Sequence, residues 1–247
     1  MDRKELFDRL VSEFVRILEE HDMASDEIII KARGLSPEEA IGNTSRKDYP
    51  ILSGREVMLE AEYRGSGGQA FTSAPSGFRG KLSDILDMDI DDDPHVGGLF
   101  IAAMNAVMRY LGLADRTIHC KDGEPEECAR QAAAYIKENY GTPRIALVGY
   151  QPALLETLSK EFPLRVLDLN PDNVGSIRYG IKVEHGEDDR REVVDGWAQL
   201  ILCTGSTLCN GTIVDYLDID KEVLFFGTTL SGSADMLGCR RICFCAR

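Results

Sequence analysis

The chain has 247 residues, of which 43% are hydrophobic and 28% are charged, a composition typical of a soluble globular protein with one large domain or two modest ones. Its 42 acidic and 28 basic residues give a formal charge of −14, which repels nucleic-acid phosphates and anionic lipid headgroups and favours cationic ligands. We therefore expect neither a nucleic-acid nor a membrane partner.

The N-terminal segment and the cysteines predict a cytoplasmic protein. Residues 1–22 carry charges throughout and lack the apolar core of a signal peptide, and no run is apolar for long enough to span a bilayer. Seven cysteines, an odd number in a chain with no expected secretion signal, indicate reduced thiols.

The N-terminal third predicts a small α+β unit. Apolar residues recur at helical spacing over residues 2–20, and a β-prone run follows at 27–32. Residues 34–54 are polar and rich in turn formers, which favours a loop. Two more β-prone runs, 57–63 and 69–73, are joined by a glycine-rich segment and are typical of a hairpin.

The acidic run DMDIDDDP, which ends at Pro94, marks the expected domain boundary. It lacks the glycine and the glutamate that an EF-hand loop requires, so we interpret residues 87–93 as a solvated linker whose last aspartate caps the next helix. We therefore expect one domain over residues 1–93 and a second over 94–247.

The second domain predicts two helices and then strands and helices in alternation. Residues 96–112 are apolar and rich in glycine and alanine, with Asn105 as the one polar interior residue; a more exposed helix is expected at 125–139, capped near Asp122. Strands are expected at 144–149, 164–169, 198–204, 222–227 and 241–245, with helices at 152–161, 208–217 and 231–237. This order is typical of an α/β fold with an open, mostly parallel sheet and helices on both faces.

Ligands of such sheets bind beyond the carboxyl ends of the strands. The segments that follow four of the strands are small or polar, and they supply these candidate ligand-binding residues: Gly149, Asp168, Thr204, Gly205, Ser206, Thr207, Asn210, Gly227 and Thr228. The segment 203–212 gathers several hydroxyl groups at an expected helix start, where capping explains only one of them. We therefore favour a site there for an anion or a carboxylate.

A nucleotide cofactor is an alternative for the same edge. Asp168 follows Gly149 at about the 20-residue spacing between a glycine loop and a ribose-binding acid. The loop has only one of the three glycines of GxGxxG, which disfavours NAD and FAD but leaves S-adenosylmethionine open. No spacing identifies a catalytic residue, and Walker, GxSxG and HExxH signatures are absent, so enzymatic activity stays undecided.

The cysteines do not have the CxxC spacing of a structural zinc site. Cys203 and Cys209 stand at the expected ligand edge, so these two and His119 are the candidate metal ligands. The other thiols fall into a group at Cys120 and Cys128 and a group around residues 239–245. In each group, the cysteines are more often buried or incidental thiols than metal ligands.

Several segments resemble a known family. The runs TGSTLCNGT (204–212), FFGTTLSGSADML (225–237) and RTIHCKDGEPEECA (116–129) are similar to the Rossmann-like heavy-metal chelation domain family. GNTSRKDYP (42–50), with the glycine-rich hairpin, resembles the enolase N-terminal-like domain that precedes it there. The resemblance marks Thr204, Gly205, Thr207, Asn210, Gly211 and Thr212, with Gly42 and Thr44 on the N-terminal side; at Cys209 we would expect an aliphatic residue in many relatives.

The resemblance implies heavy-metal chelation or metal-cofactor metabolism, with a ligand between the two domains. We expect a small polar or metal-bearing ligand in that cleft, covered by the loop that carries Gly42, Asn43 and Thr44. The expected cofactor is a transition metal, ahead of S-adenosylmethionine. The alternative function is a small-molecule transferase that uses S-adenosylmethionine or a nucleoside. The apolar helix at 96–112 also allows a homodimer contact.

Overall fold

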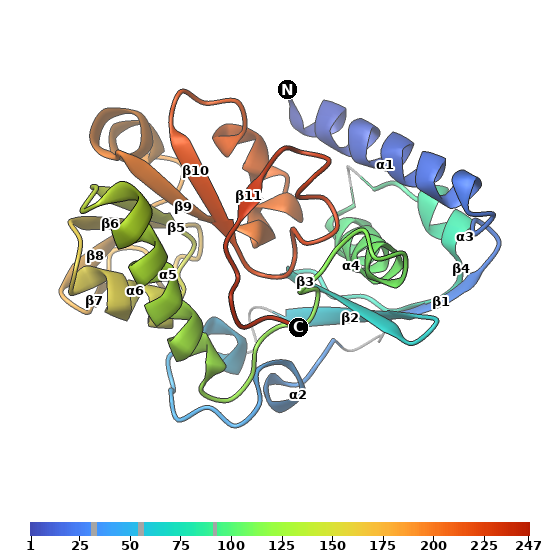
Figure 1. Cartoon of the computed structure of the whole chain (residues 1–247), viewed down its shortest axis with the longest axis horizontal. Coiled ribbons are helices and arrows are strands. Elements are labelled where there is room, and N and C mark those ends of the chain that lie inside the picture. The colour runs from blue at the N-terminus through green and yellow to red at the C-terminus, as the bar shows by residue number, and fades with distance from the viewer. Residues whose placement is uncertain (31–33, 54–56, 91–92) are drawn as a thin grey trace.

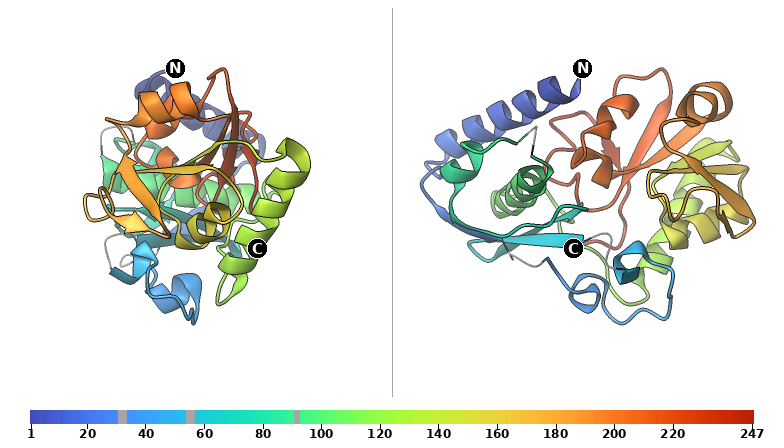
Figure 2. Two further views of the ribbon diagram at one scale, coloured as in Figure 1. Left: turned by 90° about the vertical axis from the view of Figure 1, so that its left-hand side faces the viewer. Right: turned by 180° about the vertical axis from the view of Figure 1, so that it is seen from behind.

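The computed structural model describes residues 1–30, 34–53, 57–90 and 93–247. The ends of the predicted strand 27–32 and loop 34–54, and part of the predicted linker 87–93, lie outside these residues. Two sheets stand side by side, a four-stranded antiparallel sheet and a seven-stranded, mostly parallel one (Figures 1 and 2). The expected α/β fold is confirmed.

The antiparallel sheet has the strand order β3-β2-β1-β4. Its strands are β1 (Glu27–Ile30), β2 (Val57–Tyr63), β3 (Ser66–Thr72) and β4 (Phe78–Lys81). The predicted hairpin is present, because β2 and β3 pair from Val57 opposite Thr72 to Tyr63 opposite Ser66. Strand β4 was not predicted, since four residues are too few to show alternation.

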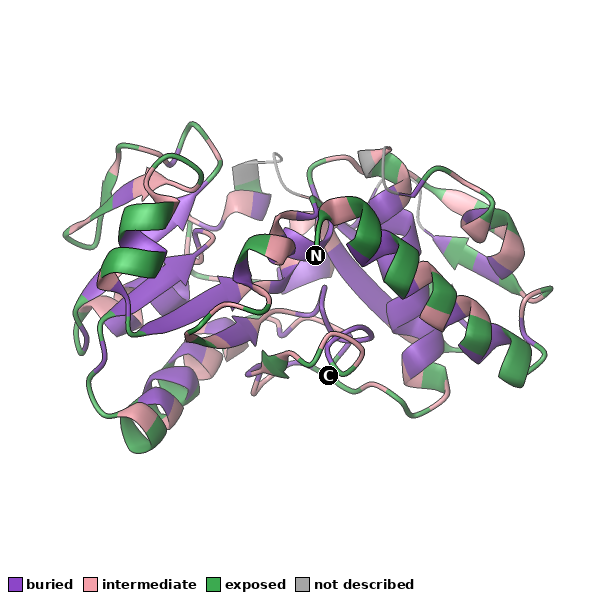
Figure 3. Cartoon of the chain, turned by 90° about the horizontal axis from the view of Figure 1, so that it is seen from above, coloured by how far each residue is buried: buried purple, intermediate pink, exposed green. Residues whose placement is uncertain are grey.

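Among the described residues, helices α1 (Arg3–Glu20), α3 (Leu82–Leu86) and α4 (Pro94–Tyr110) accompany this sheet, whereas the buried residues of α2 (Pro37–Ile41) belong to the core beneath the parallel sheet; a 3-10 helix, η1 (Pro50–Ser53), precedes β2. Helix α4 packs on β2 and β3, and α1 lies over α4, with the Phe14 and Phe100 rings edge to face at 5.8 Å (Figure 1). The outer face of α1 is exposed, whereas the strands beneath are largely buried (Figure 3). Asp93 caps α4 as predicted, its carboxylate accepting from the His95 N–H at 2.8 Å.

The parallel sheet has the order β11-β10-β9-β5-β6-β8-β7, and among the described strands only β7 and β8 pair in the antiparallel sense. Its strands are β5 (Ile145–Val148), β6 (Leu164–Asp168), β7 (Ile177–Arg178), β8 (Ile181–His185), β9 (Leu200–Thr204), β10 (Glu222–Phe226) and β11 (Arg240–Arg241). Alternate residues face opposite cores. Ile145 and Leu147 pack with helices α5 (Glu124–Tyr140) and α6 (Pro152–Ser159), whereas Ala146 and Val148 face the core that α1 and α4 share.

Several predicted elements of this half are wrong in detail. The predicted helix 208–217 is two 3-10 helices, η3 (Gly205–Leu208) and η4 (Thr212–Tyr216), because Gly211 between them has a φ of +75°. Residues 231–237 form turns, and the last strand ends at Arg241. A seven-residue π-helix, η2 (Arg191–Trp197), and the strands β7 and β8 were not predicted.

Two expectations near helix starts are also corrected. Helix α2 lies in the predicted loop 34–54, where Ser36 and Glu39 form a capping box. The N-cap of α5 is Gly123, which makes no side-chain cap. Asp122 instead accepts a hydrogen bond from the Asn43 N–H at 2.8 Å, so it holds the N-terminal segment rather than the helix.

Asn105 ties the two halves together from the interior of α4. It is fully buried, and its Nδ2 donates to the carbonyl oxygens of Gln69, Thr228 and Thr229 at 2.8 to 3.2 Å. Its Oδ1 accepts from the Gly232 N–H at 2.6 Å. One side chain therefore joins β3 to the segment after β10.

Helix α4 is enclosed within the chain, so core packing accounts for its apolar surface, and the homodimer stays a prediction. The boundary at 93/94 also stays a prediction, although α4 packs on the sheet of the first half. Within the described residues, no helix combines the length and the apolar character needed to cross a membrane.

Candidate functional site

A cavity of about 230 Å³ lies at the carboxyl edge of the parallel sheet, facing β3 of the other sheet. From β5 the chain continues to β6 on one side, while β9 and β10 lie on the other. The segments after β5 and β9 therefore diverge at this point and leave a crevice, which is the usual ligand position in open α/β sheets. The predicted location of the site thus coincides with a real cavity.

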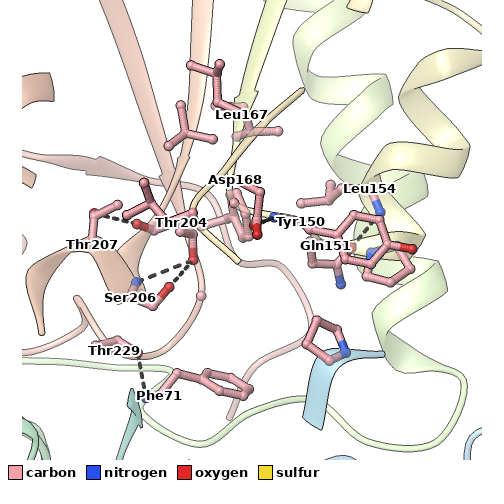
Figure 4. A pocket seen from close by; sticks show the side chains of 18 of the residues that line it. Phe71, Tyr150, Gln151, Leu154, Leu167, Asp168, Thr204, Ser206, Thr207 and Thr229 are labelled. Carbon is pink, nitrogen blue, oxygen red and sulfur yellow. Dashed lines mark hydrogen bonds between the residues drawn. The ribbon is translucent and has the colours of Figure 1, made fainter. Parts of the chain in front are cut away.

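The last residue of β9 and the segment after it present three hydroxyl groups (Figure 4). Thr204 Oγ1 and Ser206 Oγ are 2.9 Å apart, and Thr204 Oγ1 accepts from the Ser206 N–H at 3.3 Å, so Thr204 is the cap. Thr207 Oγ1 donates to the Thr204 carbonyl at 2.7 Å. Because the helix that follows is a single 3-10 turn, its dipole adds little, and the predicted anion site loses its main physical basis.

Asp168, at the end of β6, joins the segments that border the cavity. Its Oδ2 accepts from the Tyr150 N–H at 2.7 Å, and its Oδ1 accepts from the Asn170 N–H at 2.8 Å and from Asn173 Nδ2 at 3.2 Å. Both oxygens of this buried carboxylate are thus engaged by the protein.

Gly149 has a structural reason to be glycine. Its φ is +90°, and a Cβ there would lie 2.6 Å from Thr204 Cγ2. A side chain would push the segments after β5 and β9 apart, so the glycine keeps the crevice narrow.

The structure brings together only part of the predicted site. The predicted residues that line the cavity are Gly149, Asp168, Thr204, Ser206, Thr207, Asn210, Gly227 and His119, together with Thr212, which the family resemblance marks; Gly211 lies outside the lining. The predicted residues outside the lining are Gly42, Asn43, Thr44, Gly205, Thr228, Cys203 and Cys209. Thr228 is fully buried and uses its carbonyl to accept from Asn105.

Cys203 and Cys209 belong to the hydrophobic core that α1 and α4 share. Burial raises the pKa of Cys209 to about 12 and raises that of Cys203 as well, so both remain neutral thiols at pH 7. A neutral thiol must lose its proton before it can bind a metal.

His119 lies in the cavity wall, edge to face with Phe71 at 5.6 Å. Burial lowers its pKa, which favours the neutral ring. Nδ1 lies 2.6 Å from the Cys120 carbonyl oxygen, an acceptor, so Nδ1 carries the proton. Nε2 then keeps its lone pair, the form in which histidine binds metals.

Three thiols that sequence reasoning did not connect also line this cavity: Cys120, Cys128 and Cys243. We call them the thiol cluster. Hydrogen bonding to Cys120 and Cys243 lowers the pKa of Cys128, and the same interactions raise the pKa of its two partners. The sequence signal was the closeness of His119, Cys120 and Cys128, but nothing in the chain order linked them to Cys243.

The charge of the cavity is one-sided. Asp168, Glu187 and Asp215 line it, and its described lining contains no lysine or arginine. The charged side chains of the lining therefore favour a cation over a phosphate or carboxylate ligand.

The segment 42–50 closes one side of the cavity through Tyr49 and Pro50. Arg46 fixes it to the parallel-sheet half, since Nη1 donates to Glu156 of α6 at 2.7 Å and Nη2 donates to Tyr179. Nε also donates to Asp48 at 3.1 Å. We expected Gly42, Asn43 and Thr44 to cover the ligand. In the structure, the residues of this segment that line the cavity are Tyr49 and Pro50.

Comparison with known proteins identifies related folds. A family model described as "Putative heavy-metal chelation" (DUF364) matches residues 133–242. A DUF364 protein of unknown function from Pyrococcus horikoshii is 16% identical with a TM-score of 0.54, over 91% of this chain and 79% of that one. Another, from Desulfitobacterium hafniense DCB-2, is 11% identical with a TM-score of 0.50, over 74% and 72%. No curated protein matches the chain. At these identities the two structures show a shared fold.

Proposed function

We propose that this protein binds a small cationic or metal-bearing ligand in the cavity between its two sheets, as a chelator of a heavy metal or of a metal-containing cofactor. The observation that carries the proposal is the cavity lining, which combines carboxylates, hydroxyls, a neutral imidazole and thiols without any positively charged side chain among the described residues. The matching family model carries the same general description.

The size of the cavity supports a small ligand. Its volume of about 230 Å³ is below the roughly 300–1,000 Å³ of typical cofactor and drug sites. A metal ion or a compact metal complex fits such a space better than a dinucleotide does. Imidazole nitrogen and thiol sulfur bind transition metals more readily than they bind Mg²⁺ or Ca²⁺.

The transferase alternative depends on Asp168 as a ribose ligand. Both oxygens of this carboxylate already accept hydrogen bonds from the protein. The hydroxyl groups of a ribose would have to share these oxygens with the donors that hold the fold. We therefore favour chelation over the use of S-adenosylmethionine.

The proposal includes the finer assignments of the two halves. The parallel-sheet half would be a Rossmann-like domain and the N-terminal half an enolase N-terminal-like domain, with the boundary at 93/94. The ligand would lie between them, in the cytoplasm. The topological switch between β5 and β9 supports the first assignment.

Thermal unfolding of the reduced protein with Ni²⁺, Co²⁺, Zn²⁺, Cu⁺, phosphate and S-adenosylmethionine tests the proposal. We expect at least one metal to raise the melting temperature, since a ligand at 100 times its Kd stabilises by about 2.7 kcal/mol, and we expect phosphate to have no effect. Thr204→Val and Asn210→Ala should weaken the response, whereas Ser159→Ala, outside the cavity, should not. Stabilisation by phosphate or S-adenosylmethionine alone would refute the proposal.

A further inference from the structure

The thiol cluster joins three segments that are distant in the chain. Cys120 precedes α5, Cys128 lies in the first turns of that helix, and Cys243 follows β11. Cys120 and Cys243 are buried, with 4% and 5% exposure, and Cys128 is half-buried. All three are free thiols, and all three line the cavity.

The sulfur of Cys128 is the centre of the cluster. It interacts with the thiols of Cys120, Cys243 and Cys245 and with the backbone of Phe244 and Cys245. A neutral thiol is a weak acceptor that needs few donors. Polar groups close to a cysteine sulfur are a recurring feature of metal sites with thiolate ligands, and here several such groups surround one sulfur that lines the cavity.

The cluster adjoins the predicted ligand edge of the parallel sheet. The sulfur of Cys243 interacts with the backbone of Gly227, the residue directly after β10. His119, which also lines the cavity, is next to Cys120 in the chain. Soft donors and the polar segments after the strands thus share one space.

The arrangement of side chains restricts the kind of metal. Within the described residues, no three His, Cys, Asp or Glu side chains are placed to hold one ion together, as a tetrahedral zinc site requires. Soft ions such as Cu⁺ and Hg²⁺ differ, because they accept two thiolates in a near-linear arrangement. A pair that contains Cys128 suffices for such an ion.

We propose that the thiol cluster is a site for one soft, thiophilic metal ion of low coordination number, held by Cys128 together with Cys120 or Cys243. This inference rests on the proposed function and names its donors and its class of metal. The ion forms two metal–sulfur bonds and stays in the same oxidation state. Every proton still present on the two bound sulfurs is released to solvent.

Anaerobic titration of the reduced chain with Cu⁺, in competition with a chromogenic Cu⁺ chelator, tests the assignment. We expect one Cu⁺ per chain with thiolate-to-metal absorption in the near ultraviolet. Cys128→Ser should weaken binding at least 100-fold. Cys120→Ser and Cys243→Ser should each weaken it less than Cys128→Ser does, because Cys128 belongs to both pairs, and the double variant should weaken it more than either single variant.

Cys239→Ser is the matched control, since this half-buried thiol lies outside the cavity lining. Parent affinity in Cys128→Ser, or an equal loss in Cys239→Ser, would overturn the assignment. X-ray absorption of the Cu⁺-loaded parent gives a second readout that needs no variant: a shell of two sulfurs supports the site, and an oxygen or nitrogen shell refutes it. Stabilisation by Ni²⁺ or Co²⁺ that survives in Cys128→Ser, without tight Cu⁺ binding, would refute this site and leave the proposed function intact.

Discussion

Asp168 shows how one side chain can serve the fold at a position where sequence reasoning expected a ligand contact. Its two oxygens accept from donors on the segments after β5 and β6. In Asp168→Asn one oxygen becomes an NH₂ group that faces another donor, so a buried donor loses its acceptor. We expect the free energy of unfolding in the absence of ligand to fall by about 2 kcal/mol, measured by urea denaturation.

Glu187→Gln provides the comparison for this variant, because it neutralises an exposed carboxylate in the same cavity. It should change stability by less than about 0.5 kcal/mol. If Asp168→Asn were as stable as the parent chain, the carboxylate would not be needed to hold the segments together, and the transferase alternative would gain support.

At the same scale, the sequence predicted the polar residues that line the cavity better than it predicted the thiols that line it. Thr204, Ser206 and Thr207 could be placed because the carboxyl ends of parallel strands meet at one edge. Cys243 could not be linked to Cys128, since its segment was predicted as a strand and in fact follows a strand of two residues. Contacts between irregular segments leave no periodic signal in a single sequence.

Among the elements, the contact between α4 and β3 depends on Gly68. A Cβ there would lie 2.1 Å from the Ala106 nitrogen and 2.5 Å from the Ala102 carbonyl oxygen, which are backbone atoms that a rotamer change cannot move. Gly68→Ala must push the helix off the sheet. We expect it to lower the free energy of unfolding by about 3 kcal/mol in chemical denaturation and to disturb Asn105, which lies between the two alanines.

The neighbouring Gly67→Ala is a close control on the same strand. Its Cβ would meet only Ile118 Cδ1, at 2.7 Å, the end of a side chain that can rotate away. We expect the free energy of unfolding to fall by about 1 kcal/mol or less, mostly because the Ile118 side chain must change its conformation. Equal losses in the two variants would show that a general effect of glycine replacement, rather than the approach of α4, determines the result.

The small residues of α4 were evident in the sequence, but its packing partner was not. In an amphipathic helix, the polar residues mark the side that faces solvent, so the side that packs on the core can be predicted. Helix α4 is buried over most of its circumference and has no such polar side. Its sequence therefore gives no orientation. The prediction grouped it with the parallel sheet that follows in the chain, and the structure places it against the sheet that precedes it.

For the whole molecule, the sequence predicted two domains with a ligand in the cleft between them, but it did not show what holds the two halves together. Asn105 joins them in the interior, and Arg46 joins them at the surface of the cavity. Arg46 is only 13% exposed, whereas Asp48 and Glu156 are about a third exposed. Burial alone would raise the pKa of Asp48, but hydrogen bonds from Arg46 and Tyr179 outweigh it and lower that pKa.

Arg46→Ala should therefore release segment 42–50 and lower the free energy of unfolding by about 1 kcal/mol at pH 7, a modest loss because solvent screens the carboxylates. Since the folded pKa of Asp48 lies below its ordinary value of 3.8, its contribution is present at neutral pH and disappears as the pH falls through the folded value. The difference in the free energy of unfolding between parent and variant should thus shrink below about pH 4. As a second readout, amide hydrogen exchange in residues 42–50 should be faster in the variant at pH 7. Lys160, the C-cap residue of α6, is the exposed partner of Glu156, and Lys160→Ala should leave that exchange unchanged. Equal exchange in Arg46→Ala and the parent would show that Tyr49 and Pro50 hold the segment without this ion pair.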